Sequence, residues 1–590
     1  MRMRRIVTLL GIIALFGFST FLLGRTHFAT HQVIQNPNAA VHDVHTSHYT
    51  PLPRGSHPIA QLMTDSEAAF EALLSRQSKT LKAAVKEYQR RYGMRPPPHF
   101  DIWFKFAQER GVQLIDEFDI IYHLILPFWG LAPKTIRERA REAIGFDNAL
   151  ISVLIRDGIV TRADGGGEAH AWKRGAITGM MQSFVRYLPD MDLAFNVHDE
   201  PRVVVPSEDL QRLVSRAKDV AIPEASSTRW PRNSWSRRPD DLNKGDRVAE
   251  VRTTRFNRFA HQAAWTHSRA SCPVDTPARD LDDSSPDDVE KYAVGELGFI
   301  YNISAYSDIC LSPSLRNHFG LFDRPNAVDL VQDLFPIFSE SKVSSYQDIL
   351  YPSPWYWAGK VSYEPERDLD WDSKKDQLYW RGSTTGGYSR AGGWRRHHRQ
   401  VFVKNINGLS DTKILEKDYW GSWNVKEVPR PRYKDLFNVS FSHVGQCDPD
   451  DCNAQSNFFN IVDPEPREEA WKYKYVLDID GNAFSGRFYA FLLSNSLVYK
   501  CAIFREWHNE WLQPWVHFVP LSINGDDHFE SVRYFAQEEE GQIRAMHLAE
   551  LSQQWARKAL RNEDLEVWFF RLLLEYGRVI DDNRHRIGYS

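Results

Sequence analysis

The sequence predicts an α/β protein of two domains, and three features of the chain support this prediction. Residues 472–500 contain two apolar strand patterns separated by a helical pattern, which is the order of a βαβ unit. Residues 188–202 contain another alternating strand pattern, which stops at Pro201. The chain is 590 residues long, too long for a single hydrophobic core, so we expect two domains.

An apolar segment near the start predicts a membrane anchor. Residues 1–5 include three arginines, and residues 6–23 form an uncharged run of about eighteen residues, long enough to cross a bilayer. A cleaved signal peptide is the alternative, but its apolar part is usually about 7–15 residues and ends at a small-residue cleavage site that is missing here. Because the arginines precede the run, we expect residues 1–5 in the cytosol and the body in a lumen.

The next segments predict a stem followed by a helix. Residues 24–62 are rich in His, Pro, Ser, Thr and Asn and contain few large apolar residues, a composition typical of an unpacked stem. In residues 63–99, Thr64 and Glu67 have the spacing of a capping box, and apolar residues keep helical spacing up to Gly93. We therefore expect one long helix to lead into the globular body.

The body divides by composition. We expect residues 100–330 to form an N-terminal lobe and residues 331–590 a C-terminal lobe that ends in a helical tail packed across it. Residues 206–288 are dominated by Ser, Arg, Asp and Pro, so we expect a long insertion there. The net charge is −4 and the lysines and arginines form no basic stripe, which argues against nucleic acid as a partner.

Cysteines and sequons fit a luminal body. Five cysteines cannot all pair, and none has zinc-site spacing with histidine. In an oxidising lumen we expect one free cysteine and two disulfides, namely free Cys501 and the pairs Cys272 with Cys310 and Cys447 with Cys452. Two Asn-x-Ser sequons predict glycosylation, at Asn302 and Asn438.

Asp199 follows the strand pattern within residues 188–202 and is the first candidate functional residue. In open α/β sheets the carboxyl ends of strands face the ligand crevice, so Asp199 is placed to act on a ligand. A turn or a helix cap is the alternative role for a single aspartate after a strand.

A polar loop after another strand pattern predicts an anion site. Residues 377–380 lead into Arg381, Gly382 and Ser383, and a basic helical pattern with Arg396 and Arg399 follows. Glycines allow close backbone approach, hydroxyls donate hydrogen bonds, and arginines neutralise charge, so the loop suits a phosphate. The lysine of a P-loop is absent, and a solvated turn remains the alternative.

The βαβ unit at 472–500 contains the second candidate anion site. Asn482 lies in the turn after the first strand pattern, and Ser485, Gly486 and Arg487 lie where the helix is expected to begin. Free backbone amides at a helix start and an arginine in the first turn bind phosphate well. An ordinary strand-turn-helix of an α/β core is the alternative.

An aromatic stretch with fixed backbone predicts a sugar platform. Tyr351, Trp355 and Trp357 lie among prolines, and their rings offer flat faces on which a sugar could stack. A packed loop between domains is the alternative.

These motifs together resemble glycosyltransferase family 90, which includes capsule-associated fungal transferases and animal protein O-glucosyltransferases. The resemblance rests on Lys-Tyr-Lys-Tyr at 472–475, the Asp-Gly and Ser-Gly-Arg-Phe motifs that follow, and Trp-Leu-x-Pro-Trp at 511–515. It implies a GT-B-like fold of two Rossmann-like lobes. It also implies a metal-independent, inverting transfer, with no cofactor and with a UDP-sugar held in the C-terminal lobe.

The resemblance also implies roles for individual residues. Asn196, Val197 and Pro201 match the family's Asn-Val-x-Asp-x-Pro motif, which makes Asp199 the catalytic base. The donor-binding set it implies is Arg381, Gly382, Ser383, Arg396, Arg399, Asn482, Ser485, Gly486 and Arg487, and the acceptor side is implied at Tyr351, Trp355 and Trp357. Asp478 and Asp480 form an Asp-x-Asp pair, but the resemblance and their position in a strand argue against a metal site.

The activity expected from this resemblance is transfer of xylose from a UDP-sugar to a mannan-like glycan in polysaccharide biosynthesis. The expected location is the Golgi or endoplasmic reticulum membrane, as a single-pass type II protein with a luminal body. Glucosyl transfer to protein serine is one alternative. A non-catalytic carbohydrate-binding protein of the same fold is another, and the presence of Asp199 beside an intact Arg-Gly-Ser loop argues against it.

Overall fold

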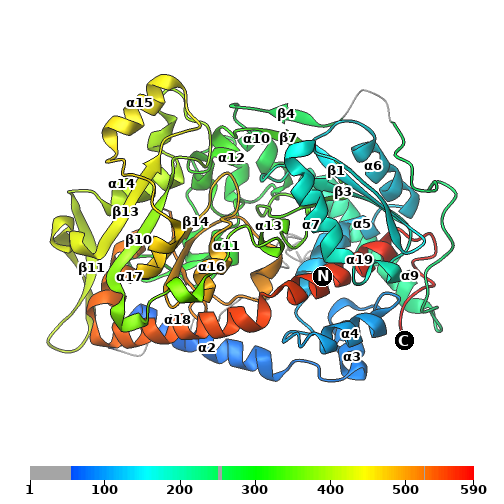
Figure 1. The fold of residues 1–590 in the computed structure, drawn as a ribbon, viewed down its shortest axis with the longest axis horizontal. Helices are drawn as coiled ribbons and strands as arrows, with labels where there is room; N and C mark the ends of the chain where they lie inside the picture. Colours follow the sequence, from blue (N-terminus) through cyan, green and yellow to red (C-terminus); the bar gives the residue numbers. More distant parts are fainter. Residues whose placement is uncertain (1–54, 250–254, 524) are drawn as a thin grey trace, which may run out of the picture.

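The computed structural model describes residues 55–249, 255–523 and 525–590 (Figure 1). The predicted tail at 1–5, the predicted anchor at 6–23 and most of the predicted stem at 24–62 lie outside these residues. Within the described part of the chain, none of the helices has both the length and the apolar character needed to cross a membrane.

Two five-stranded sheets form the centre of the molecule, and Figure 1 shows them on opposite sides with a short helix, α13, between them. In spatial order the first sheet contains β2 (Ile159–Gly165), β1 (Leu150–Arg156), β3 (Met191–Asn196), β8 (Ile337–Ser339) and β9 (Ile349–Leu350). β1 pairs antiparallel with β2 and β3, whereas β3, β8 and β9 are parallel. This sheet is therefore mixed and differs from the wholly parallel sheet of a Rossmann fold.

The second sheet is parallel throughout. In spatial order it contains β13 (Phe437–His443), β10 (Lys375–Ser383), β14 (Tyr473–Ile479), β15 (Leu497–Cys501) and β16 (Val519–Pro520). Between β14 and β15 lies α16 (Phe488–Leu493), so the predicted βαβ unit is present. We call the parts built around the two sheets the first and second lobes. The α/β prediction is confirmed, and the GT-B-like designation stays a prediction.

The two lobes share one hydrophobic core, and the second sheet has a further apolar cluster of its own. One cluster of buried apolar residues joins Phe195 and Ile337 of the first sheet to Val476 and Val498 of the second. The division expected at residue 330 also differs from the structure, because β8 and β9 complete the first sheet. Which sheet β8 and β9 join is decided by the strand with which they pair. That strand is distant in sequence, so a local pattern does not reveal it.

The helices of the first lobe include α4 (Phe100–Glu109), α5 (Asp119–Trp129), α6 (Pro133–Gly145), α7 (Ala171–Met181), α8 (Ser207–Arg216) and α9 (Ile222–Ser227), of which α5, α6 and α7 pack on the sheet. The predicted insertion at 206–288 is wrong in its first part, because α8 packs on α5 and buries Leu210 and Leu213. Its polar residues lie on the outer face of an amphipathic helix.

Helices also cover the second sheet, namely α14 (His398–Ile406), α15 (Pro449–Phe458), α17 (Asp527–Gln537) and α18 (Glu539–Ala559). The last helix, α19 (Asn562–Val579), packs instead on α4, α5 and α7 of the first lobe. The helical tail thus covers both lobes rather than the C-terminal lobe alone.

Short elements complete the described chain. The helices are α10 (Trp265–Ser268), α11 (Ile303–Tyr306), α12 (Gly320–Asp323) and α13 (Pro354–Trp357). Three two-stranded ribbons pair β4 (Asn257–Phe259) with β7 (Val328–Leu330), β5 (Ala293–Val294) with β6 (Phe299–Ile300), and β11 (Asp411–Lys417) with β12 (Trp423–Pro429).

The predicted leading helix is two helices, α2 (Pro58–Ser75) and α3 (Leu81–Tyr92). Thr64 is not a cap, because its hydroxyl donates to Ala60 O inside α2, and the side chain of His57 caps that helix. The Thr80 hydroxyl caps α3, which explains the break. Gly93 ends α3 in the left-handed conformation at φ 65°, as its sequence position predicts.

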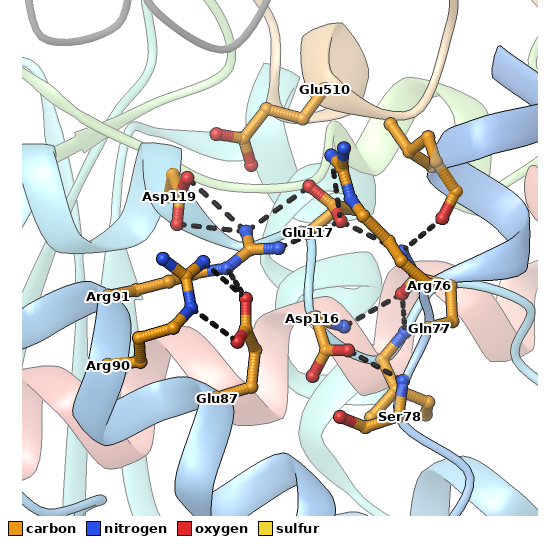
Figure 2. Close-up of polar contacts among 12 residues, drawn as sticks. Arg76, Gln77, Ser78, Glu87, Arg90, Arg91, Asp116, Glu117, Asp119 and Glu510 are labelled. Atoms are coloured by element: carbon orange, nitrogen blue, oxygen red, sulfur yellow. Dashed lines mark hydrogen bonds and ion pairs between the residues drawn. The ribbon is translucent and has the colours of Figure 1, made fainter. Parts of the chain in front are cut away.

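A cluster of charged side chains holds α3 to the body (Figure 2). Arg91 lies 3.0 Å from Glu117 and 3.3 Å from Asp119. Glu510, from the second lobe, accepts a hydrogen bond from the backbone N of Ile120 at 2.6 Å. Burial and the nearby charges of Asp119 and Glu117 raise the pKa of Glu510 well above its ordinary value, which favours the protonated, uncharged form. The cluster therefore connects the N-terminal helices to both lobes.

Both predicted disulfides, Cys272–Cys310 and Cys447–Cys452, are present, and Cys501 is free and buried. The predicted glycosylation sites do not fit the folded chain. Asn302 is 6% exposed, and its side-chain oxygen caps α11 by accepting from Ala305 N at 3.0 Å. The amide nitrogen of Asn438, to which a glycan would be attached, donates to the hydroxyl of Tyr473 at 2.7 Å.

Candidate active site

Asp199 lies in a turn fixed at the carboxyl end of β3. The side-chain nitrogen of Asn196, the last residue of β3, donates to Glu200 O at 2.7 Å and to the Ser339 hydroxyl at 3.1 Å. These bonds join the turn to β8, the neighbouring parallel strand. The position predicted for Asp199, directly after a buried strand, is confirmed by the course of the chain.

The Asp199 side chain is exposed, yet protein atoms enclose it on several sides. This partial burial raises the pKa of the carboxyl from its ordinary value, and the positive charge of Lys173 opposes the rise. A carboxylate with a raised pKa that remains open to a ligand is suited to accept a proton.

The two residues next to Asp199 are less available to a ligand than Asp199 itself. Glu200 is buried, and burial together with the charge of Asp199 raises its pKa to about 8, so it is mostly protonated at neutral pH. His198 Nε2 lies 3.0 Å from the carboxylate of Asp329. Of the three consecutive residues, Asp199 is thus the one exposed carboxylate.

The predicted Arg-Gly-Ser motif ends β10 in the second lobe. The guanidinium of Arg381 points to β13 and to the following loop, where it donates to Asn438 Oδ1 at 2.7 Å and lies 2.9 Å from Glu465. Its backbone carbonyl accepts a hydrogen bond from Arg487 Nη1 at 2.8 Å. Arg381 therefore orients Arg487 through its backbone while its own charge is paired.

Arg399, in the first turn of α14, is the centre of the predicted anion site. Its guanidinium donates to Ser383 O at 3.0 Å and to the Thr385 hydroxyl at 2.9 Å, and Nε donates to Asp480 O at 2.8 Å. Burial and the charge of Arg487 lower the pKa of Arg399 to about 9. Two guanidinium groups thus lie close enough to repel each other, and an anion between them would relieve that repulsion.

Two glycines in the loop after β10 allow close packing against other segments, in addition to the close approach of a ligand to the backbone. Gly386 has φ 114°, and a Cβ there would lie 2.5 Å from the ring of His398. Its backbone N donates to Asn482 Oδ1 at 3.2 Å, which joins the two predicted halves of the donor site. A Cβ at Gly387 would lie 2.4 Å from Gly320. The loop therefore keeps its shape through contacts with segments distant in sequence.

Two expectations about the donor site need correction. Arg396 lies outside the Arg399 cluster, because its half-exposed guanidinium pairs with Asp323 at 3.2 Å. The helix that follows Ser485 and Gly486 begins only at Phe488 and is six residues long. With Arg487 at its N-cap position, a ligand here would meet a guanidinium rather than a series of free helix amides.

The predicted acceptor platform is only partly available. Tyr351 is 0% exposed and packs against Phe195 in the core, so it cannot contact an acceptor. Trp355 and Trp357 in α13 are half-buried. Trp355 Nε1 donates to Gly486 O at 3.2 Å, and Trp357 packs on Gly179 of α7.

Helix α13 connects the two halves of the site, and Figure 1 shows it between the two sheets. Ser353 precedes it, and the Ser353 hydroxyl donates to the carboxylate of Glu340, which contributes to the electrostatic environment of Asp199. At the other end, Trp355 contacts Gly486, and the Tyr356 hydroxyl donates to Ser485 O at 3.1 Å. Helix α13 therefore contacts the Ser-Gly-Arg motif directly and is connected to the surroundings of Asp199 through Ser353 and Glu340.

The Asp-x-Asp pair is engaged within the protein. Asp478 forms an ion pair with Lys500 at 2.9 Å, and Asp480 Oδ2 accepts from the backbone N of Ile503 at 2.7 Å. Burial raises the pKa of Asp480 to about 7. In the described residues, no cluster of His, Cys, Asp and Glu has the arrangement of a metal site. Metal independence stays a prediction.

Chelation of divalent cations with EDTA is expected to leave most of the glycosyltransferase activity that the resemblance implies. The reason is that arginines rather than a metal would face the diphosphate of the UDP-sugar. The measurement is turnover with and without EDTA, followed by addition of Mn²⁺. Loss of all activity with EDTA and recovery with Mn²⁺ would restore the metal-site interpretation.

Asp478→Asn is expected to lower the unfolding free energy by about 3–5 kcal/mol, since it leaves Lys500 buried without its partner.

Sequence reasoning missed two charged residues of the site. Lys173 and Glu340 form an ion pair beside Asp199. Lys173 lies in an amphipathic helix and Glu340 after a short strand, and neither has a local signal that distinguishes it from a surface charge.

Comparison with known proteins gives a family match over part of the chain. Residues 319–586 match the model of the family described as Glycosyl transferase family 90. Protein O-glucosyltransferase 1 of Homo sapiens is 24% identical over 305 residues, 47% of this chain and 66% of the relative. The O-glucosyltransferase rumi homolog of Aedes aegypti is 25% identical over 272 residues, 42% of this chain and 57% of the relative.

O-glucosyltransferase rumi of Drosophila melanogaster is 24% identical over 253 residues, 42% of this chain and 55% of the relative. This chain therefore covers less than two thirds of the length of these relatives. The resemblance predicted from the motifs is confirmed over residues 319–586, whereas Asp199 lies before the matched residues.

Proposed function

We propose that this chain, whose residues 319–586 carry the pattern of glycosyltransferase family 90, is an inverting glycosyltransferase of GT-B-like fold. Its donor is a UDP-sugar and its acceptor is a hydroxyl of a glycan or a protein. The observation that carries the proposal is the series of contacts that runs from the surroundings of Asp199, an exposed carboxylate, through Ser353 and Trp355 to Gly486. Gly486 precedes Arg487, whose guanidinium neighbours that of Arg399. A base and an anion site connected in this way are the two parts that such a transfer needs.

The reaction follows from these parts. Asp199 accepts the proton of the acceptor hydroxyl as its oxygen forms a bond to the anomeric carbon. The bond from that carbon to the β-phosphate oxygen breaks on the opposite face, and UDP leaves with the electron pair. Arg399 and Arg487 stabilise the charge that develops on the diphosphate, in a partly buried setting where electrostatic stabilisation is strong.

Glucose is the donor sugar that the comparisons favour. The relatives carry the name O-glucosyltransferase, which supports the glucosyl alternative over the xylosyl transfer expected from the motifs. Transfer to a serine hydroxyl of a protein is accordingly the preferred acceptor class.

A panel of UDP-sugars separates these possibilities. Full-length protein is incubated with each donor, and release of UDP is measured with and without added acceptor. We expect UDP-glucose to give the highest kcat/KM, with UDP-xylose lower. Preference for UDP-xylose would restore the xylosyl assignment, and UDP binding without turnover of any donor would indicate a non-catalytic carbohydrate-binding protein.

We also propose a luminal location with residues 6–23 as the anchor. Two disulfides support an oxidising compartment. Carbonate extraction of membranes is the test, and recovery of the protein in the soluble fraction would contradict the anchor.

A further inference from the structure

A buried ion pair lies between the turn of Asp199 and helix α13. Lys173 Nζ of α7 is 2.6 Å from Glu340 Oε1, which follows β8, and the two side chains are 4% and 5% exposed. Lys173 also donates to Val197 O at 3.2 Å, two residues before Asp199. The lysine thus holds the backbone of the turn that carries the base.

The glutamate extends the connection to the donor site. Its second oxygen accepts from the Ser353 hydroxyl, and Ser353 Oγ in turn accepts from the backbone N of Trp355 at 3.1 Å. The indole of Trp355 donates to Gly486 O at 3.2 Å, next to Arg487. A continuous series of polar contacts therefore runs from the turn of Asp199 to the Ser-Gly-Arg motif of the second lobe.

A buried ion pair is a costly way to join two elements. Apolar residues of similar volume usually give equal or greater stability, because two charges must be removed from water. Here both charges lie beside a third ionisable group, the carboxyl of Asp199, and they act on it with opposite sign. Position and charge therefore both point to a role beyond packing.

We propose that Lys173 and Glu340 are positioning residues for the transfer reaction: they hold Asp199 in register with the donor motif and set the charge around it. The inference rests on the proposed function and adds to it two residues that do not touch the reacting atoms. The pair works as a unit, since Lys173 contacts the turn of the base and Glu340 contacts the support of α13.

The two charges make the inference testable through pH. The positive charge of Lys173 lowers the pKa of Asp199, and the negative charge of Glu340 raises it. The other charged or titratable groups facing Asp199 are His198, His170 and Glu200. Because the base must be deprotonated, the acidic limb of the kcat/KM profile follows the pKa of Asp199.

The experiment compares Lys173→Met and Glu340→Gln in the full-length protein, with UDP release from UDP-glucose measured across pH. We expect the acidic limb to move to higher pH in Lys173→Met and to lower pH in Glu340→Gln. In both variants kcat is expected to fall about tenfold or more, while the KM for UDP-glucose stays within about threefold, since placement rather than donor binding is affected. The double variant is expected to keep the low kcat but return the acidic limb toward its original position.

Arg156–Asp192 supplies the matched control. It is a buried ion pair of 2.6 Å in the same sheet, with Asp192 at the other end of the strand that leads to Asp199. Asp192→Asn is expected to lower thermal stability without moving the acidic limb. Lys173→Arg keeps the charge and is expected to keep the limb, so it separates the effect of the charge from that of the substitution. If Lys173→Met does not fold, Glu340→Gln tests the inference through its expected shift to lower pH.

Opposite shifts of the acidic limb in the two variants would support the inference. Unchanged limbs, or shifts in the same direction, would show that the pair only stabilises the fold and would overturn it. An unmodified protein that releases UDP from none of the donors would instead overturn the proposed function, and this inference with it.

Discussion

Replacing Asp199 with Asn is expected to lower the rate of transfer by about a hundred- to ten-thousand-fold, because an acceptor hydroxyl is a poor nucleophile without a positioned base. Affinity for UDP is expected to stay within a few-fold, since the arginines lie in the second lobe and do not contact Asp199. The measurements are kcat with saturating donor and the Kd for UDP.

The pH profile of the unmodified protein checks the same residue. Asp199 has a raised pKa, so activity is expected to decline on acidification at a higher pH than the ordinary aspartate value of about 3.9. This follows because protonation removes the base as the pH falls through its pKa.

Glu200→Gln is the matched control for Asp199→Asn. Glu200 is the adjacent carboxyl, and because its pKa is raised to about 8, it is already mostly uncharged at neutral pH. Replacing this mostly protonated carboxyl with an uncharged amide is therefore expected to change activity by less than about threefold. Full activity in Asp199→Asn, or loss of UDP binding in that variant, would show that another group accepts the proton.

Arg487→Ala is expected to weaken UDP binding about tenfold to a hundredfold and to reduce turnover as well. Hydrogen bonds to charged groups contribute about 1.5–3 kcal/mol, and the guanidinium of Arg487 lies beside Arg399, where the diphosphate is proposed to bind. The measurements are the Kd for UDP by calorimetry and kcat/KM for the donor.

Arg396→Ala is the control for Arg487→Ala, because it removes another arginine predicted for the donor site, one that pairs with Asp323 at the surface. We expect UDP affinity in this variant to stay within about twofold, since exposed ion pairs contribute little. Equal losses in the Arg487→Ala and Arg396→Ala variants would mean that the donor site includes both arginines and that the structure-based assignment is wrong.

Local patterns in the sequence were sufficient for the elements of the second lobe. The short aromatic and β-branched runs around Tyr475 and Val498 predict two strands, and both are present in a parallel βαβ unit. The position of Asp199 directly after a buried strand was also predictable from the local pattern, because large apolar residues at every second position precede it and all residues of β3 are buried.

Long-range contacts decided which side chains belong to the candidate site. Arg396 and Arg399 are three residues apart and equally basic, and only packing against Asp480 and Ser383 selects Arg399. Tyr351 belongs to an aromatic motif, yet the closeness of Phe195 places it in the core.

The sequence by itself thus determined the α/β class, the family resemblance and the place of Asp199 after its strand. The tertiary structure decided that β8 and β9 belong to the first sheet, that α13 joins the two halves of the site, and that Lys173 meets Glu340 beside the base. The physical reason is that periodicity records which face of an element is buried. Which elements that face meets depends on contacts between residues far apart in the chain, and a charge such as Lys173 has no periodic signature that could reveal its partner.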